Sequence, residues 1–377
     1  MTHPPIPQTD PRAGYLEQRD AIDAAIARVL DSGWYILGQE AAAFEARFAG
    51  FVGVGHAIGC GNGTDALELA LRACHIGAGD LVFTVSHTAV ATVAAIERAG
   101  ATPVLIDIEP DGFTMDPAEL ERALRAPAGL SAGRPAAVMP VHLYGEPAAL
   151  DEIAVIAHAH GLRLIEDAAQ SHGAEYRGRM TGSIGDFGCF SFYPTKNLGA
   201  LGDAGALVSN DRELAVAARE IREYGWRDRY VSAVPGINTR LDPIQAGILN
   251  VKLDTLVRDN ARRQTIAAQY DAGLADLPLE LPRRRASATH VYHQYVVRTA
   301  KRDRLREHLR QAGIGTGLHY PLPVHLQPAY RGRIAAGPSG LCRSEAVARD
   351  ILSLPIYPQL GEPAADRVIA EIRRFFL

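Results

Sequence analysis

The chain has 377 residues, of which 47% are hydrophobic and 22% are charged, and its formal net charge is −4. This length suits about two domains, and so small a charge excludes a nucleic-acid binder that acts through bulk positive charge. No apolar run approaches the roughly 18 residues of a membrane-spanning helix, and the polar, Pro-rich segment 1–12 lacks the apolar core of a secretory signal.

Cysteine and lysine are both scarce. The four cysteines lie far apart without a CxxC pair, which argues against a disulfide framework or a zinc site and favours the cytoplasm. His158 and His160 lie two positions apart on a predicted helix and face different sides, so no metal site is expected. Arginine stays protonated, so only Lys196, Lys252 and Lys301 could act as amine nucleophiles.

The first 50 residues predict two helices, the first of which ends at residues 31–33. Their apolar positions recur at helical spacing, at Ile22, Ile26, Val29 and Leu30 and then at Phe44, Phe48 and Phe51. We expect these side chains to pack in a core.

From residue 56 onward, short apolar runs alternate with helical segments. The apolar runs are 56–61, 81–86, 103–108, 136–143, 163–166, 187–193 and 205–208, and the helical segments are 65–74, 88–98, 117–125 and 147–160. Such alternation predicts a mostly parallel sheet covered by helices on both faces. Little sequence separates the last two runs, so the sheet is expected to become mixed there.

The C-terminal third predicts a second, smaller domain. Helix-forming sequence from 243 to 271 has no strong break and is expected to bridge the two domains. A strand at 292–298, a charged helix at 302–312 and a short helix from Pro363 follow. We therefore divide the chain into a large domain at 1–245 and a small α/β domain at 246–377.

A glycine-rich turn at 59–64 lies between a predicted strand and a predicted helix. Free N–H groups at a helix start form an anion site. A glycine turn with a purely structural role would have the same sequence pattern. A dinucleotide fingerprint is disfavoured, because it requires glycine where Thr64 stands and an acidic residue after the next strand, which ends at His87 instead.

Two more segments carry reactive side chains. Glu166 and Asp167 end one predicted strand, and Lys196 follows another. Alone, the acid could cap a helix and the lysine could be a solvated loop residue. Together with the anion site, they supply what pyridoxal phosphate needs: a phosphate cradle, a carboxylate for the pyridine nitrogen and a lysine for the Schiff base.

The sequence resembles the DegT/DnrJ/EryC1/StrS family of pyridoxal phosphate-dependent nucleotide-sugar aminotransferases almost from end to end. The matching segments are 32–38, 62–67, 140–145, 166–174, 190–199, 236–242, 319–321 and 352–355. The resemblance implies an α/β, fold type I transferase with a mostly parallel mixed sheet flanked by helices and a smaller C-terminal α/β domain.

The resemblance also implies roles for individual residues. Lys196 would hold the cofactor and act as general acid and base, Asp167 would pair with the pyridine nitrogen, and Gln170 would approach the ring hydroxyl. The phosphate would be bound by Gly63, Thr64, Ser191 and, from the neighbouring subunit of an obligate homodimer, Asn238. Substrate contacts are expected from Tyr35, His319 and Tyr320.

This chain departs from the family pattern at two positions. Many members have an aromatic residue, stacked on the cofactor ring, where this chain has Ala89, and His87 is a candidate replacement. Asn62 stands where serine is usual. Some relatives with histidine in place of the lysine catalyse dehydration, so Lys196 favours transamination.

The implied reaction moves an amino group from L-glutamate to a nucleotide-linked keto-6-deoxy sugar. Segments 224–230 and 238–242, with Asn62, resemble the branch that aminates C3 of a dTDP-3-keto-6-deoxyhexose. Amination at C4 and amination of an inosose are the alternatives within the family. A non-catalytic protein that senses the cofactor or a sugar is the alternative of a different class.

Overall fold

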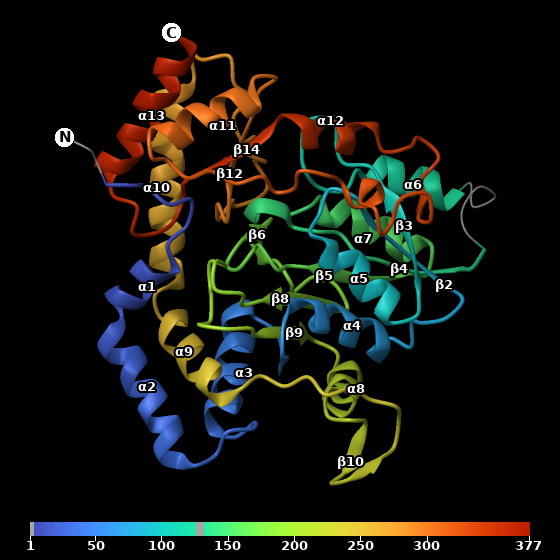
Figure 1. Ribbon diagram of the computed structural model, residues 1–377. Helices are drawn as coiled ribbons and strands as arrows, with labels where there is room; N and C mark the ends of the chain where they lie inside the picture. The colour runs from blue at the N-terminus through green and yellow to red at the C-terminus, as the bar shows by residue number, and fades with distance from the viewer. Residues whose placement is uncertain (1–3, 126–131) are drawn as a thin grey trace.

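The computed structural model describes residues 4–125 and 132–377 (Figure 1). The first three residues of the Pro-rich segment 1–12 therefore lie outside the described residues. Within the described ranges, no helix combines the length and the apolar character needed to cross a membrane.

An eight-stranded sheet forms the centre of the molecule. In spatial order its strands are β1 (His56–Cys60), β9 (Gly205–Ser209), β8 (Phe187–Ser191), β5 (Arg163–Asp167), β4 (Arg134–Val138), β2 (Asp80–Val85), β3 (Thr102–Ile106) and β13 (Ala335–Ala336). Strand β9 is antiparallel to both neighbours, and the other pairs are parallel. The predicted mostly parallel mixed sheet is confirmed, and its antiparallel strand is the run expected at 205–208.

Helices cover both faces of this sheet (Figure 1). On one face, α4 (Gly63–Ala73), α5 (Val90–Arg98) and α8 (Arg212–Arg222) share a core with Ile165 and Val82. On the other face, α6 (Pro117–Arg125) and α7 (Leu150–Ala159) pack with Leu164 and Phe83, which are adjacent to Ile165 and Val82 along the same strands. Because successive strand residues point to opposite faces, each buried strand needs an uninterrupted apolar run.

The N-terminal helices α1 (Pro11–Glu17), α2 (Arg19–Ser32) and α3 (Gln39–Val52) lie beside the sheet. Phe44 and Phe48 of α3 are fully buried with Phe190 and Phe192, as the spacing predicted. Leu30, expected on the buried face of α2, is instead 52% exposed.

The C-terminal region has a core of its own. Strands β12 (Tyr295–Arg298) and β14 (Ile351–Leu354) pair antiparallel, and α10 (Leu256–Leu274), α11 (Arg302–Gln311) and α13 (Glu362–Phe376) enclose them. Helix α12 (Cys342–Asp350) precedes β14. Ile6 joins this core from the N-terminus, and β13 leaves it to extend the large sheet.

The helix expected at 243–271 is two helices, α9 (Pro243–Leu253) and α10. The break falls at Thr255, whose hydroxyl donates to the carbonyl of Lys252 at 3.2 Å. A threonine side chain that bonds to the nearby backbone in this way competes with the helical ladder. Helices α8 and α12, the hairpin of β10 (Trp226–Asp228) and β11 (Val231–Ser232), and the hairpin of β6 (Glu175–Tyr176) and β7 (Arg179–Met180) were not predicted.

Candidate active site

Eight of the predicted site residues line one cavity of about 530 Å³. They come from the start of α4, the carboxyl end of β5, the segment from the end of β8 onward, and the loop near residue 320. These residues are Gly63, Thr64, Asp167, Gln170, Ser191, Lys196, His319 and Tyr320. The cavity thus lies at the carboxyl edge of the parallel strands, where open α/β sheets bind ligands.

The start of α4 can hold an anion. The Asn62 side chain caps the helix by accepting the N–H of Asp65 at 2.9 Å, whereas first-turn N–H groups such as those of Gly63 and Thr64 have no partner within a helix. A Cβ at Gly63 would lie only 2.6 Å from the Cβ of Ser191. Glycine is therefore required there, and its N–H, with that of Thr64 and the Ser191 hydroxyl, can bind a phosphate.

The carboxylate of Asp167 is held by two donors at the end of β5. The Thr92 hydroxyl donates to Oδ2 at 2.8 Å and the Ala169 N–H donates to Oδ1 at 3.2 Å. Burial raises the pKa of Asp167, and these two donors and the charge of Lys196 offset part of the rise. A buried carboxylate on a cavity wall can bind a protonated ring nitrogen.

The neighbouring acid, Glu166, has a structural role. Its carboxylate accepts the N–H groups of Gly182, Ile184 and Gly185 at 2.7–2.8 Å and lies 3.0 Å from His142 Nε2. Burial acts to raise the pKa of Glu166, but these donors outweigh it and the pKa is lowered. Its lone pairs are used within the protein, so Asp167 is the acid that remains for a ligand.

Lys196 lies in a tight turn just after β8. Its N–H donates to the Tyr193 carbonyl at 2.8 Å, and the next side chain, Asn197, donates to Asn260 at 2.8 Å. Burial lowers the pKa of the Lys196 amine to about 8, against the opposing effect of Asp167. A useful fraction of the amine is therefore unprotonated near neutral pH, as a nucleophile requires.

The other two lysines are not on the cavity wall. Lys252 is partly buried, and its amine donates to the Gly199 carbonyl at 2.7 Å behind the Lys196 turn. Burial lowers its pKa to about 8 as well. Lys301 lies at the exposed start of α11.

His319 and Tyr320 reach the cavity from the C-terminal region. Gln170 accepts the Tyr144 N–H at 2.8 Å and donates to the Tyr320 hydroxyl at 3.2 Å. His319 Nδ1 lies 2.8 Å from the Ser353 hydroxyl, and burial lowers the His319 pKa to about 4. This imidazole is therefore neutral at physiological pH.

The structure does not bring His87 to the cavity wall, so its role toward the cofactor ring stays a prediction. Its ring is 1% exposed, and Nε2 lies 2.8 Å from the hydroxyl of Tyr144. Thr88 and Ala89, the next two residues, line the cavity instead. In this position His87 contacts Tyr144 from behind the cavity wall.

Asn238 and Tyr35 lie outside the cavity. Asn238 is exposed between β11 and α9. Tyr35 is 53% exposed, and its hydroxyl donates to the Leu30 carbonyl at 3.2 Å. The role of Tyr35 toward substrate and that of Asn238 toward a neighbouring subunit stay predictions.

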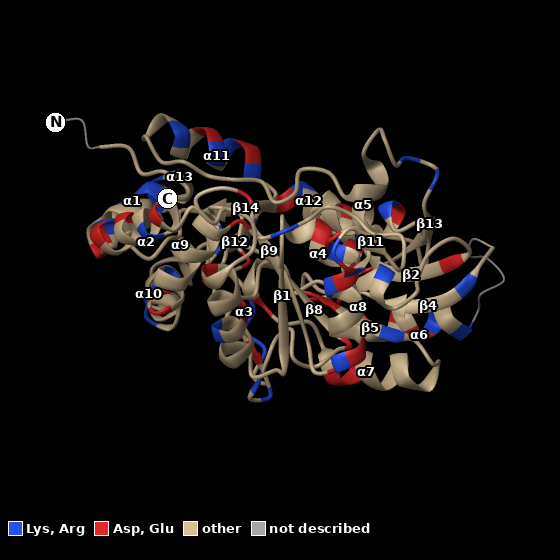
Figure 2. Ribbon diagram, turned by 90° about the horizontal axis from the view of Figure 1, so that it is seen from below, with Lys and Arg blue, Asp and Glu red and all other residues tan. Residues whose placement is uncertain are grey.

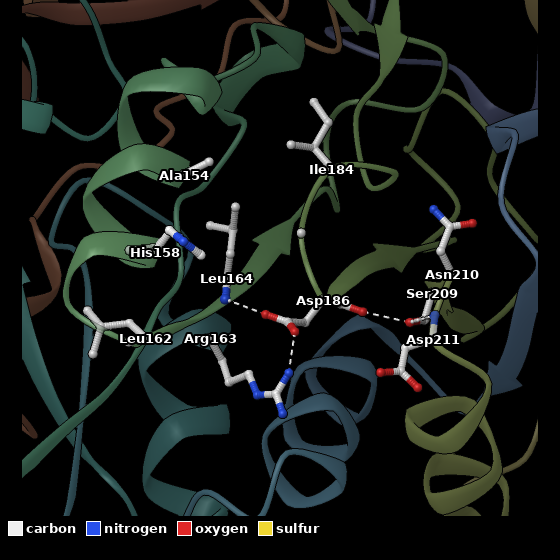
Figure 3. A pocket seen from close by; sticks show the side chains of 13 residues that line it. Ala154, His158, Leu162, Arg163, Leu164, Ile184, Asp186, Ser209, Asn210 and Asp211 are labelled. Carbon is white, nitrogen blue, oxygen red and sulfur yellow. Dashed lines mark hydrogen bonds and ion pairs between the residues drawn. The ribbon is translucent and has the colours of Figure 1, made fainter.

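A second hollow, of about 620 Å³, opens at the opposite edge of the sheet, at the amino end of β5 (Figure 3). Arg163 and Asp186 pair there at 2.6 Å, and Asp186 also accepts the Leu164 N–H. No lysine lines this hollow within the described residues. Acidic and basic residues are interspersed along the outer helix α11 (Figure 2).

Three residues at the site escaped the sequence analysis. Thr92, which orients Asp167, stands one helical turn after Thr88, and their hydroxyls lie 2.9 Å apart. That spacing was a usable signal. His293 and Gln294, which line the cavity just before β12, lie within an apolar run and carried none.

The residues present fit pyridoxal phosphate. The turn at Gly63 admits no Cβ, the buried Asp167 bonds only to neutral donors, and an amine with a lowered pKa lines the same cavity. Across residues 4–125 and 132–377, no group of three His, Cys, Asp or Glu side chains is arranged to hold a metal ion.

Comparisons with known proteins agree with this geometry. The model of the DegT/DnrJ/EryC1/StrS aminotransferase family matches residues 17–373. The dTDP-3-amino-3,4,6-trideoxy-alpha-D-glucose transaminase of Streptomyces venezuelae is 48% identical over 99% of this chain and 96% of its own length.

Two further matches have a similar extent. The dTDP-3-amino-3,6-dideoxy-alpha-D-galactopyranose transaminase of Aneurinibacillus thermoaerophilus is 41% identical over 98% of this chain and 99% of its own. A solved structure of S. venezuelae DesV in complex with a ketimine intermediate superposes with a TM-score of 0.94, at 48% identity and with 99% of each chain covered.

Proposed function

This chain belongs to the DegT/DnrJ/EryC1/StrS aminotransferase family, and we propose that it transfers an amino group from L-glutamate to C3 of a dTDP-linked 3-keto-6-deoxyhexose. It is a pyridoxal phosphate-dependent aminotransferase. The observation that carries the proposal is one cavity that combines the phosphate cradle, Asp167 and Lys196 in a chain 48% identical to a 3-amino sugar transaminase.

Different residues of the chain bind the phosphate and the ring nitrogen of the cofactor. Bound pyridoxal phosphate supplies an electron sink for the carbon that carries the nitrogen. Gly63, Thr64 and Ser191 would anchor its phosphate, and Asp167 would keep a proton on its pyridine nitrogen. Thr92 orients the Asp167 carboxylate through its 2.8 Å bond to Oδ2.

Lys196 performs both covalent and proton-transfer work. Its amine, with a pKa lowered to about 8, would hold the cofactor covalently as a nucleophile. The same Nζ, when free, would accept a proton from the substrate carbon that bears nitrogen and give it up again, as general base and then general acid. The cavity would serve the amino acid and the keto sugar in turn.

The assembly and location belong to the same proposal. An exposed Asn238 is available to a second subunit. Separately, the apolar side chains of Trp34, Tyr35 and Ile36, between α2 and α3, are 47–65% exposed. Exposed apolar segments of this kind favour a protein interface, which supports a homodimer with shared active sites. All four cysteines are free, which supports a cytoplasmic enzyme.

The test offers the purified holoenzyme L-glutamate with dTDP-3-keto-6-deoxyglucose and, separately, with dTDP-4-keto-6-deoxyglucose. We expect glutamate to bleach the cofactor absorbance band and NMR to show the new amine at C3. Amination only at C4 would overturn the sugar assignment. A band that responds to no amino donor would favour the sensor alternative.

A further inference from the structure

His293 is a buried imidazole on the cavity wall that the roles above leave unused. It precedes β12, is 5% exposed and lines the same cavity as Lys196. Its Nδ1 is buried and has no hydrogen-bond partner in the protein. A buried polar atom without a partner, at the wall of a binding cavity, indicates a contact that a ligand completes.

The neighbouring glutamines determine which ring nitrogen of His293 carries the proton. Gln8 donates its amide N–H to Gln294 Oε1 at 2.7 Å, which fixes the Gln294 amide group. The Gln294 nitrogen then faces His293 Nε2 at 3.5 Å. An amide nitrogen can only donate, so Nε2 serves as the acceptor and the proton resides on Nδ1.

The charge around this imidazole favours a neutral ring. Burial lowers the pKa of His293 well below its usual value, and the nearby charge of Lys196 adds to the effect. His293 therefore presents an uncharged Nδ1–H donor close to the reactive amine. A neutral imidazole can donate a hydrogen bond to an oxygen of a ligand. It does not donate a proton to Lys196, and it carries no positive charge that would pair with Asp167.

Apart from Lys196 itself, which the reaction uses, the described part of the cavity wall offers no unpaired cation for a carboxylate. Arg98, the arginine on that wall, is paired with Asp65 at 3.0 Å and with Glu68 at 2.7 Å. The amino donor nevertheless carries an ionised carboxylate directly on the reacting carbon, which must lie beside Lys196. A neutral donor next to Lys196 is therefore the available partner for that carboxylate.

We propose that the Nδ1–H of His293 binds the α-carboxylate of the amino donor. The inference rests on the proposed function and deepens it, since it assigns one residue to the amino-acid half of the reaction. A hydrogen bond to an ionised carboxylate is stronger than one to a sugar hydroxyl. His293 therefore discriminates between the two substrates that use the cavity in turn.

The test uses His293→Leu, which removes the donor, and His293→Asn, whose amide N–H can occupy the place of Nδ1–H. His160→Leu, on the exposed end of α7, is the matched control. Calorimetry measures the binding of glutarate, an unreactive dicarboxylate, to each holoenzyme. Stopped-flow absorbance measures the half-reaction with L-glutamate and with its α-amide, L-isoglutamine, and the half-reaction with the keto sugar.

In the wild-type protein we expect glutamate to react at least about tenfold faster than isoglutamine. His293→Leu should reduce this ratio to about threefold or less, weaken glutarate binding at least about tenfold and leave the sugar half-reaction within about twofold. His293→Asn should recover most of both effects. His160→Leu should match the wild-type protein.

Unchanged glutarate binding in His293→Leu would overturn the inference, as would an equal loss in both half-reactions or a loss of cofactor affinity. Failure of the proposed function is distinguishable from these outcomes. If no keto sugar reacts with the wild-type protein, the sugar assignment fails, while glutarate binding and the glutamate half-reaction still test His293.

Discussion

The pKa of Asp167 is raised because its carboxylate is buried. Two uncharged hydrogen-bond donors and the charge of the Lys196 amine stabilise the ionised form only in part. An acid whose pKa is higher in the folded than in the unfolded chain takes up protons on folding. Its effect on stability is therefore unfavourable above the folded pKa and disappears as the pH falls through that value. The ionised state that binds the cofactor thus costs the fold some stability.

Asp167→Asn should separate these two consequences. The Thr92 hydroxyl can turn to accept from the new amide and donate to Thr88 instead, so the local bonds survive. We expect the cofactor-free variant to melt about 2–4 °C higher than the wild-type protein at pH 7. Aminotransferase activity should fall at least about 100-fold.

Scanning calorimetry of both proteins between pH 4 and pH 8 checks the sign. The difference in melting temperature should shrink as the pH is lowered, because the wild-type carboxyl then becomes protonated. A variant that is less stable than the wild-type protein at every pH would contradict the effect of burial on Asp167.

The segment 182–185 is held to β5 by the carboxylate of Glu166. Three backbone N–H groups and His142 converge on that one side chain, and all lie in the interior. Glu166→Gln replaces one acceptor oxygen by an amide that faces N–H donors. We expect this variant to lose about 3–5 kcal/mol of unfolding free energy.

Urea unfolding followed by circular dichroism measures that loss. Glu121→Gln, on the exposed surface of α6, is the control and should change the unfolding free energy by less than about 0.5 kcal/mol. If Glu166→Gln unfolds like this control, the carboxylate does not hold the segment.

Among the helices and strands, the sequence predicted those that have a regular hydrophobic pattern. Continuous apolar strands and the helices between them were identified, because burial on two faces leaves a run that is easily recognised. The break at Thr255 was missed, because a side chain that bonds to the backbone changes no hydrophobic pattern. Helix α8 was missed although Asp211 caps it by accepting two N–H groups.

The site was predictable to a similar degree. The residues that motifs and resemblance identified lie in one cavity, with the exception of His87, Asn238 and Tyr35. The position of His87 could not be predicted, because it depends on a hydrogen bond to Tyr144, 57 positions away in the sequence. His293 could not be found, because its importance follows from an unpartnered nitrogen that only tertiary structure shows.

The whole molecule is expected to work as a homodimer whose sites use Asn238 of the second subunit. Lys196→Ala and Asn238→Ala are each expected to be inactive alone. In a mixed dimer, one site combines an intact Lys196 with an intact Asn238, and the other site lacks both. Random reassociation of the two variants should therefore recover about a quarter of the wild-type activity.

Two differently tagged variants, unfolded together, refolded and purified through both tags, provide the measurement. Activity in the doubly tagged fraction, and none in either parent, would support shared sites. Confirmed mixed dimers without activity would show that each site is built within one chain.

The central claim is that Lys196, in this cavity, is the amine that holds the cofactor. The chain offers a stringent comparison, because burial lowers the pKa of Lys252 to about 8 just as it does for Lys196. If the pKa of the amine alone decided where the cofactor attaches, both lysines would carry it. Only Lys196 lines the cavity with Asp167, whereas the Lys252 amine is bonded to the Gly199 carbonyl.

The most direct measurement reduces the holoenzyme with borohydride and locates the pyridoxyl group by peptide mass spectrometry. We predict that the group is found on Lys196 alone, that Lys196→Ala abolishes the labelling and that Lys252→Met leaves it intact. A pyridoxyl group on Lys252 or Lys301, or labelling that persists in Lys196→Ala, would contradict the account.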